Sequence, residues 1–179
     1  MNDSFTRVEE AINNCAQCTP TYPRHEILLT KLYGHVYNRL MDYLNRPLKE
    51  HGLNTTLFSA LMQIYASDDN RISPSDLSDA IFSSRTNVTR LADELVKNGW
   101  VTRHASQEDR RKMILSLTPE GRALLDRVLP SQRVIVKQLW AELDAADRDA
   151  IERLLRGLLN RLDHSLSSGT EPSRIHADV

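Results

Sequence analysis

The sequence feature that most restricts the fold is a pair of short helices, each with its own start and stop signals, in residues 73–99. Ser73-Pro74 places a helix-capping residue before a proline, a combination that favours the first turn of a helix. A second helix is expected after Ser83 or Ser84, and Gly99 ends it in the left-handed conformation that glycine adopts easily. The apolar positions expected to face the core are Leu77, Ala80, Ile81, Val88, Leu91, Ala92, Leu95 and Val96. Two short helices joined by a tight turn predict a helix-turn-helix.

Two candidate strands follow this helix pair. Residues 100–104 and 113–117 are short segments typical of strands. The polar stretch between them ends in Asp109-Arg110-Arg111-Lys112, so the two strands predict a β-hairpin with a basic tip. Thr118-Pro119-Glu120 then begins another helix. We therefore predict a mainly α-helical protein with a small β-hairpin wing, a winged helix-turn-helix.

Long amphipathic helices are expected on both sides of the winged domain. Residues 24–50 carry an apolar stripe at helical spacing, and a last helix after Asp144 has leucines at the three- and four-residue spacing of a helix-packing seam. We expect Pro47 to kink or shorten the end of the first helix, and Pro130 to kink or break the helix that begins at Pro119. This apolar surface exceeds what a small winged domain covers, so we expect a two-fold homodimer to bury it. A monomeric helical bundle is the alternative.

These segments divide the chain into five regions. They are a loosely held, flexible N-terminal arm at 1–22, a first dimerisation helix at 23–52, the winged helix-turn-helix at 53–118, C-terminal dimerisation helices at 119–167 and a disordered tail at 168–179. The winged region opens with a helix expected from Thr55 to Ala66, capped by Asn54. No apolar run is long enough to span a membrane, and the N-terminus lacks the basic start and apolar core of a signal peptide. We therefore expect a cytoplasmic protein.

Charge is distributed unevenly along the chain. Residues 83–112 contain seven basic and four acidic residues, a net charge of +3, whereas the rest of the chain carries −4. A basic island of this kind is typical of a phosphate-binding site, and a solvated charged face is the alternative. The segment from Ser83 to Arg90 contains no acidic residue at all.

The first two turns of the second helix carry side chains suited to double-stranded DNA. In a helix-turn-helix this end of the helix enters the major groove. Arginine can pair with guanine and asparagine with adenine, while serine and threonine hydroxyls suit phosphates. Val88 and Leu91 are expected to face inward. The expected DNA-binding residues of this helix are Ser83, Ser84, Arg85, Thr86, Asn87, Thr89 and Arg90.

Two motifs resemble those of a known family. The segment Ser83–Leu95 resembles the recognition helix of MarR-type regulators. Asp109–Lys112, followed by Leu115–Gly121, resembles their wing and the helix after it. The resemblance covers about residues 22–165, and the two motifs together are more specific than either alone. It implies a transcriptional regulator that binds a pseudo-palindromic operator as a homodimer.

The resemblance also assigns roles on the wing. It implies that Arg111 enters the minor groove, where a narrow groove concentrates negative potential, and that Asp109 orients it. Arg110 and Lys112 would then contact phosphates, although which of Arg110 and Arg111 inserts more deeply stays open. A flexible charged loop is the alternative interpretation.

A small aromatic ligand is a further implication, because MarR-type regulators often bind aromatic anions between the dimer helices and the DNA-binding lobe. Tyr37 and Phe58 could stack on a ring, while His35, Asn38 and Thr55 could hold a phenol or carboxylate. The alternative is that the aromatic residues belong to the core and that His35 is a surface residue. The implied function is a repressor of multidrug-efflux or stress genes that such a ligand releases from its operator.

Other classes of function have weaker support. Cys15 and Cys18 form a C-x-x-C motif, which could serve as a redox switch or supply two ligands of a metal site. A metal usually needs four ligands, and only His25 is near the pair in sequence. Two free thiols are therefore the simpler interpretation. We therefore predict no metal site. The chain has no G-x-S-x-G, phosphate loop, H-E-x-x-H or dinucleotide-binding turn, so we expect neither enzymatic activity nor a cofactor. A winged-helix protein-interaction module is the remaining alternative.

Overall fold

The computed structural model describes residues 4–106, 109 and 111–168, and these form seven α-helices and one small sheet. In chain order the elements are α1 (Thr6–Cys18), α2 (Arg24–Lys49), α3 (Thr55–Ala66), a 3₁₀ turn (Asp68–Asn70), β1 (Arg71–Ile72), α4 (Pro74–Ala80), α5 (Arg85–Lys97), β2 (Val101–Ala105), β3 (Met113–Leu117), α6 (Pro119–Leu139) and α7 (Ala145–Ser167). The chain divides into two compact units, one up to Arg133 and one from Val134. The first contains the winged helix-turn-helix that the sequence predicts.

Side-chain caps start the helices where the sequence predicted. The Asn54 side-chain oxygen accepts a hydrogen bond from the Leu57 amide at 2.8 Å, and the Ser73 hydroxyl accepts one from the Asp76 amide at 3.1 Å. Asp144 does the same at the start of α7. Each cap satisfies a backbone donor that has no partner within its own helix. The predicted boundaries of α3, and the predicted start of α7, are therefore confirmed.

The hydrophobic core lies inside the winged domain, where α3, α4, α5, the sheet and the first part of α6 meet. Its fully buried large side chains are Leu48, Leu57, Leu61, Ile64, Leu77, Val88, Leu95, Val101, Leu115, Leu125 and Val128. Val96 was expected to face this core, but it is exposed because Leu95 and Leu91 already occupy the inward face of α5.

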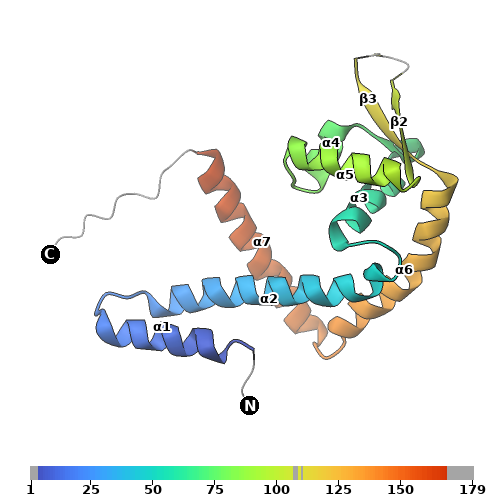
Figure 1. The fold of residues 1–179 in the computed structure, drawn as a ribbon. Coiled ribbons are helices and arrows are strands. Elements are labelled where there is room, and N and C mark those ends of the chain that lie inside the picture. Colours follow the sequence, from blue (N-terminus) through green and yellow to red (C-terminus); the bar gives the residue numbers. More distant parts are fainter. Residues whose placement is uncertain (1–3, 107–108, 110, 169–179) are drawn as a thin grey trace. The chain divides into compact units, whose positions relative to one another are not determined.

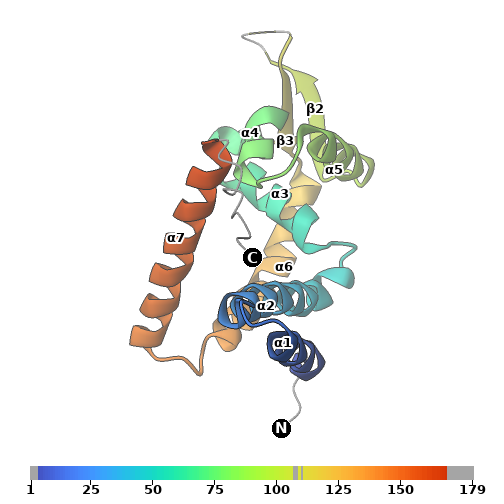
Figure 2. The same cartoon turned by 90° about the vertical axis from the view of Figure 1, so that its left-hand side faces the viewer.

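The sheet has three antiparallel strands in the order β1-β3-β2. Val101 lies opposite Leu117 and Ala105 lies opposite Met113, so β2 and β3 form the predicted hairpin. Figures 1 and 2 show this hairpin extending beyond α4 and α5. The sequence did not predict β1, because a strand of two residues has no periodicity to recognise.

The N-terminal segment forms a helix, so the prediction of a loosely held arm at 1–22 was wrong. α1 and α2 lie side by side in both views, and Figure 1 shows that they run in opposite directions (Figures 1 and 2). Phe5 and Ile12 are each 5% exposed, and the Phe5 ring packs at a tilt on His35 of α2, with 5.5 Å between the ring centroids. Arg24 donates a hydrogen bond to the Asn13 side chain at 2.8 Å. Burial of apolar side chains against α2 therefore orders this segment. Of the predicted tail at 168–179, Ser168 caps the end of α7 by donating its amide to the His164 carbonyl, and the remaining residues lie outside the described part of the chain.

Neither internal proline ends its helix. α6 continues through Pro130 to Leu139, and Pro47 lies in the last turn of α2. A proline removes one backbone donor, and the helix after it persists where packing compensates. In the part of the chain that the structure describes, no helix is both long enough and apolar enough to cross a membrane.

Candidate nucleic-acid interface

Helix α5 presents its first two turns to solvent. Ser84 is the residue that caps it, since its hydroxyl accepts a hydrogen bond from the Asn87 amide at 3.3 Å. Val88 is 1% exposed and Leu91 8% exposed, which fixes the inward face of the helix. The predicted DNA-binding residues on the other faces are exposed, with Ser83 half-buried: Ser84, Arg85, Thr86, Asn87, Thr89 and Arg90. The first turn carries no acidic residue, so it leaves the positive end of the helix dipole uncompensated.

One of these side chains is already engaged within the helix. The Thr89 hydroxyl donates to the Arg85 carbonyl at 3.0 Å. A phosphate oxygen can only accept hydrogen bonds, so Thr89 would have to release this bond to bind one. Arg85 and Asn87 are the side chains of the first turn whose donors suit guanine and adenine.

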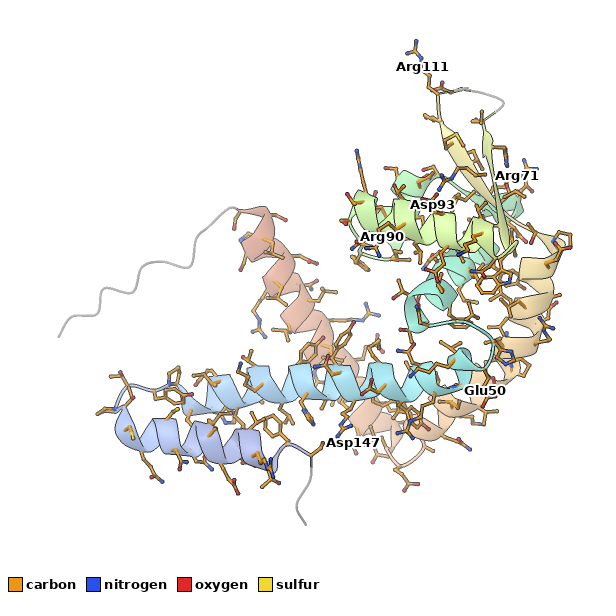
Figure 3. All side chains as sticks on the ribbon, in the orientation of Figure 1. Glu50, Arg71, Arg90, Asp93, Arg111 and Asp147 are labelled. Atoms are coloured by element: carbon orange, nitrogen blue, oxygen red, sulfur yellow. The ribbon has the colours of Figure 1, made fainter. Side chains whose placement is uncertain are left out.

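The wing tip is shaped by Asp109. Its carboxylate accepts a hydrogen bond from the Arg111 amide at 3.0 Å, and its carbonyl accepts one from the Lys112 amide at 2.8 Å. The Ser106 amide donates to the Lys112 carbonyl at 2.8 Å, which closes the base of the tip. Asp109 therefore contacts Arg111 at its backbone amide, and the Arg111 side chain points away from the domain at the end of the hairpin (Figure 3). Arg110, predicted as a phosphate contact, lies outside the described residues.

An ion pair joins the two halves of this surface. Arg103 of β2 and Asp93 of α5 approach to 2.9 Å between Nη2 and Oδ1. From the sequence, both residues are recognisable only as charges within residues 83–112. The pair could still have been predicted from the sequence, because both residues lie on the outward faces of adjacent elements, α5 and β2. The pair links β2 of the wing to the helix that it flanks.

The five residues predicted to bind an aromatic ligand lie on different faces of the chain. His35 faces α1, where its Nε2 lies 2.7 Å from the Ser4 hydroxyl oxygen. Tyr37 follows two residues later, about 200° further around α2, and is exposed, as is Asn38. The Thr55 amide donates to the Asn45 side chain at 2.7 Å, and Phe58 packs against the core. A ligand site made of all five residues stays a prediction.

Cys15 and Cys18 are exposed free thiols, one helical turn apart on α1. Loss of hydration raises the pKa of the neighbouring Tyr22 hydroxyl, and the charge and hydrogen bond of Cys15 raise it further.

Among the described residues, no group of three or more His, Cys, Asp or Glu side chains could hold a metal ion.

A two-helix motif with an exposed, cationic second helix, flanked by a basic hairpin, defines a winged helix-turn-helix of the class that regulates transcription. Comparison with known proteins agrees. The MarR family matches residues 51–112. The transcriptional repressor MprA of Escherichia coli K12 is 43% identical over 169 residues, which are 94% of this chain and 96% of MprA. The chain belongs to the MarR family of transcriptional regulators.

Solved structures give the same fold. Sco3205, a MarR family transcriptional regulator from Streptomyces coelicolor solved in complex with DNA, superposes with a TM-score of 0.70 at 25% identity, covering 87% of this chain and 94% of that one. BpsR of Bordetella bronchiseptica, whose DNA binding is regulated by 6-hydroxynicotinic acid, has a TM-score of 0.66 at 25% identity and covers 72% of this chain and 91% of its own.

Proposed function

We propose that this chain is a repressor that binds a pseudo-palindromic DNA operator as a homodimer. The observation that carries the proposal is the outward face of α5, where Arg85, Asn87 and Arg90 are exposed on a segment without acidic residues. These side chains are suited to base edges and phosphates in the major groove. A regulator of this kind acts on the chromosome, so the proposal places it in the cytoplasm.

The wing supplies the second part of the DNA interface in this proposal. Arg111 enters the adjacent minor groove, and Lys112 contacts a phosphate, with Arg110 in the same role. Support comes from the turn around Asp109, which directs Arg111 away from the domain. The relative Sco3205, solved with DNA, has the same fold.

Unpartnered apolar surface in each unit supports the homodimer. In the first unit, α2 exposes Leu29, Leu32, Tyr33, Val36 and Tyr37. In the second unit, α7 buries none of its residues 145–167, and it exposes Leu154, Leu155, Leu158, Leu159, Leu162 and Leu166 along one face. Helices with stripes of this size need a partner, and a second copy under two-fold symmetry supplies a matching stripe.

A small aromatic anion releases the repressor in this proposal, and multidrug-efflux or stress genes are its targets. Two relatives support it: MprA is a transcriptional repressor, and 6-hydroxynicotinic acid, an aromatic carboxylate, regulates DNA binding by BpsR. The ligand lowers operator affinity by binding more tightly to a dimer whose recognition helices are wrongly spaced. The proposed contacts are His35, Tyr37, Asn38, Thr55 and Phe58.

The test is selection of bound duplexes from a random pool by the full-length protein, followed by titration of the selected duplex in rising salt. We expect two inverted half-sites with centres about one helical turn apart, and a steep loss of affinity with salt as counterions are released. Binding without sequence preference contradicts operator recognition. No duplex binding even at low salt contradicts the proposal entirely and favours a protein-interaction module.

A further inference from the structure

Three helices of the first unit end in the same hydrogen-bonded motif. In this motif one residue adopts the left-handed conformation, and its amide donates a hydrogen bond to the carbonyl three residues earlier. The amide of the next residue donates to the carbonyl five residues before it. After α2, Gly52 has a φ of 70°, and Leu53 donates to Leu48 at 3.0 Å. After α5, Gly99 has a φ of 74°, and Trp100 donates to Leu95 at 3.1 Å. Glycine suits this position because it has no Cβ to clash.

The third motif, in the turn between α4 and α5, has a phenylalanine at the glycine position. Phe82 has a φ of 50°, and its amide donates to the Asp79 carbonyl at 3.3 Å. The Ser83 amide donates to the Ser78 carbonyl at 3.0 Å, and the Ser78 hydroxyl donates back to the Ser83 carbonyl. Ser78 therefore holds the turn from both sides. A bulky residue with positive φ is an outlier that persists only where its surroundings impose it.

The Phe82 side chain does not offset this strain by packing in the core. It is 94% exposed, more than any other large apolar side chain in the described part of the chain. Glycine at this position, as at the ends of α2 and α5, would make the folded chain more stable, because phenylalanine adds both backbone strain and an exposed ring. Strained, exposed residues of this kind cluster at functional sites.

The position of Phe82 indicates what the ring meets. It lies two residues before Ser84, the cap of α5, and three before Arg85, so it stands at the end of the helix that we propose enters the major groove. The residues that follow it, from Ser83 to Arg90, carry two arginines and no acid, which suits a polyanion. DNA offers a ring at this place two apolar surfaces, the 5-methyl group of thymine and the carbons of deoxyribose.

We propose that Phe82 is a DNA-contacting residue that packs its ring on apolar atoms of the duplex beside the major-groove contacts of α5. The inference rests on the proposed function and extends it. Burial of the ring adds hydrophobic binding energy that salt does not screen, whereas salt weakens the electrostatic contacts of Arg85 and Arg90 with phosphates. It also explains why the turn keeps a phenylalanine where glycine would fold with less strain.

The test compares wild type with Phe82→Gly and Phe82→Leu on the operator selected by the wild type. We expect Phe82→Gly to bind about tenfold more weakly or worse, and Phe82→Leu to keep part of the affinity. Phe82→Gly should melt at an equal or higher temperature, since glycine accepts positive φ without strain, so lost affinity cannot be ascribed to unfolding. Val96→Ala, an exposed apolar residue near the other end of α5, is the matched control and should bind as wild type does.

A second operator with uracil in place of thymine identifies the contacted atoms. If the ring packs on a thymine methyl, the wild type should lose about fourfold per contacted methyl, and Phe82→Gly should be less sensitive to the same replacement. Equal sensitivity of the two proteins assigns the contact to deoxyribose instead. Equal operator affinity of wild type and Phe82→Gly at matched salt overturns the inference and leaves the proposed function intact. A wild type without sequence preference overturns both.

Discussion

Among single residues, Gly121 is the most tightly enclosed of the glycines in the described chain. A Cβ at this position would lie 2.2 Å from the Trp100 carbonyl oxygen and 2.9 Å from Leu117 Cδ1. The same carbonyl accepts the Thr118 amide at 3.0 Å, so it cannot easily move. We expect Gly121→Ala to lower the free energy of unfolding by about 2 kcal/mol or more, through forced separation of α6 from the hairpin. Urea denaturation measures this change.

Gly157 is the matched control for that substitution, because it is also a helical glycine. Nothing lies within 4 Å of a Cβ built there. Gly157→Ala should therefore stabilise the chain by about 0.5–1 kcal/mol, through the higher helix propensity of alanine. Equal midpoints for the two variants would show that the close approach at Gly121 does not constrain the fold.

Asn87 tests base recognition at the residue scale. Its side chain is exposed in the first turn of α5, and an asparagine amide can pair with both hydrogen-bonding atoms of adenine in the major groove. We expect Asn87→Ala to reduce discrimination between the operator and point-mutated operators by about 1–3 kcal/mol. The measurement is a set of matched titrations at one salt concentration. An equal loss on every sequence would instead mark Asn87 as a phosphate contact.

At the scale of elements, the hairpin wing makes a separable contribution. Arg111 lies at its tip, and within the described part of the wing its tie to the turn is the hydrogen bond from its backbone amide to Asp109. Arg111→Ala should therefore lower operator affinity about tenfold and reduce the salt slope by about 1, without changing the melting temperature. Arg156→Ala removes the same charge from α7 and should bind as wild type does. Unchanged affinity of Arg111→Ala would remove the wing from the interface.

The sequence could predict those elements whose ends are set by local chemistry. Asn54, Ser73 and Asp144 are caps, and their hydrogen bonds start α3, α4 and α7 as expected. α1 was missed because Phe5 and Ile12 become buried only against α2, a contact between distant segments. Likewise, α6 continues through Pro130, where local propensity alone favours a break.

The candidate site was predictable to the extent that composition and helical period describe it. Val88 and Leu91 fixed the inward face of α5, and this left Arg85 and Asn87 outside, as the structure shows. Phe82 was not predicted as a candidate contact, because it stands out only through its positive φ in the turn, which the periodicity of the sequence does not reveal. A sequence signal does exist: a helix stop without glycine, while Gly52 and Gly99 end neighbouring helices.

At the scale of the whole molecule, one recognition helix contacts too few base pairs to select a unique site. Binding by two copies multiplies the affinities of two half-sites, because the second half-site meets a helix that the first has already brought close. In the proposed dimer, the apolar stripes of α2 and α7 therefore contribute to operator affinity together with the residues of α5. The proposal thus links dimerisation to operator recognition energetically.

Leu162 on α7 tests this link. It is half-exposed within the leucine stripe, and a charge there would be buried unpaired twice in a two-fold interface, at a cost of several kcal/mol. We expect Leu162→Glu to sediment as a single 20.4 kDa chain and to bind the full operator at least 100-fold more weakly than wild type, about as it binds one half-site. Asn160→Glu adds the same charge about 200° away around α7 and should remain a dimer with wild-type affinity. A wild type that sediments as a monomer, or a Leu162→Glu dimer with full affinity, would show that this stripe packs within one chain, and the two-fold operator would then lose its physical basis.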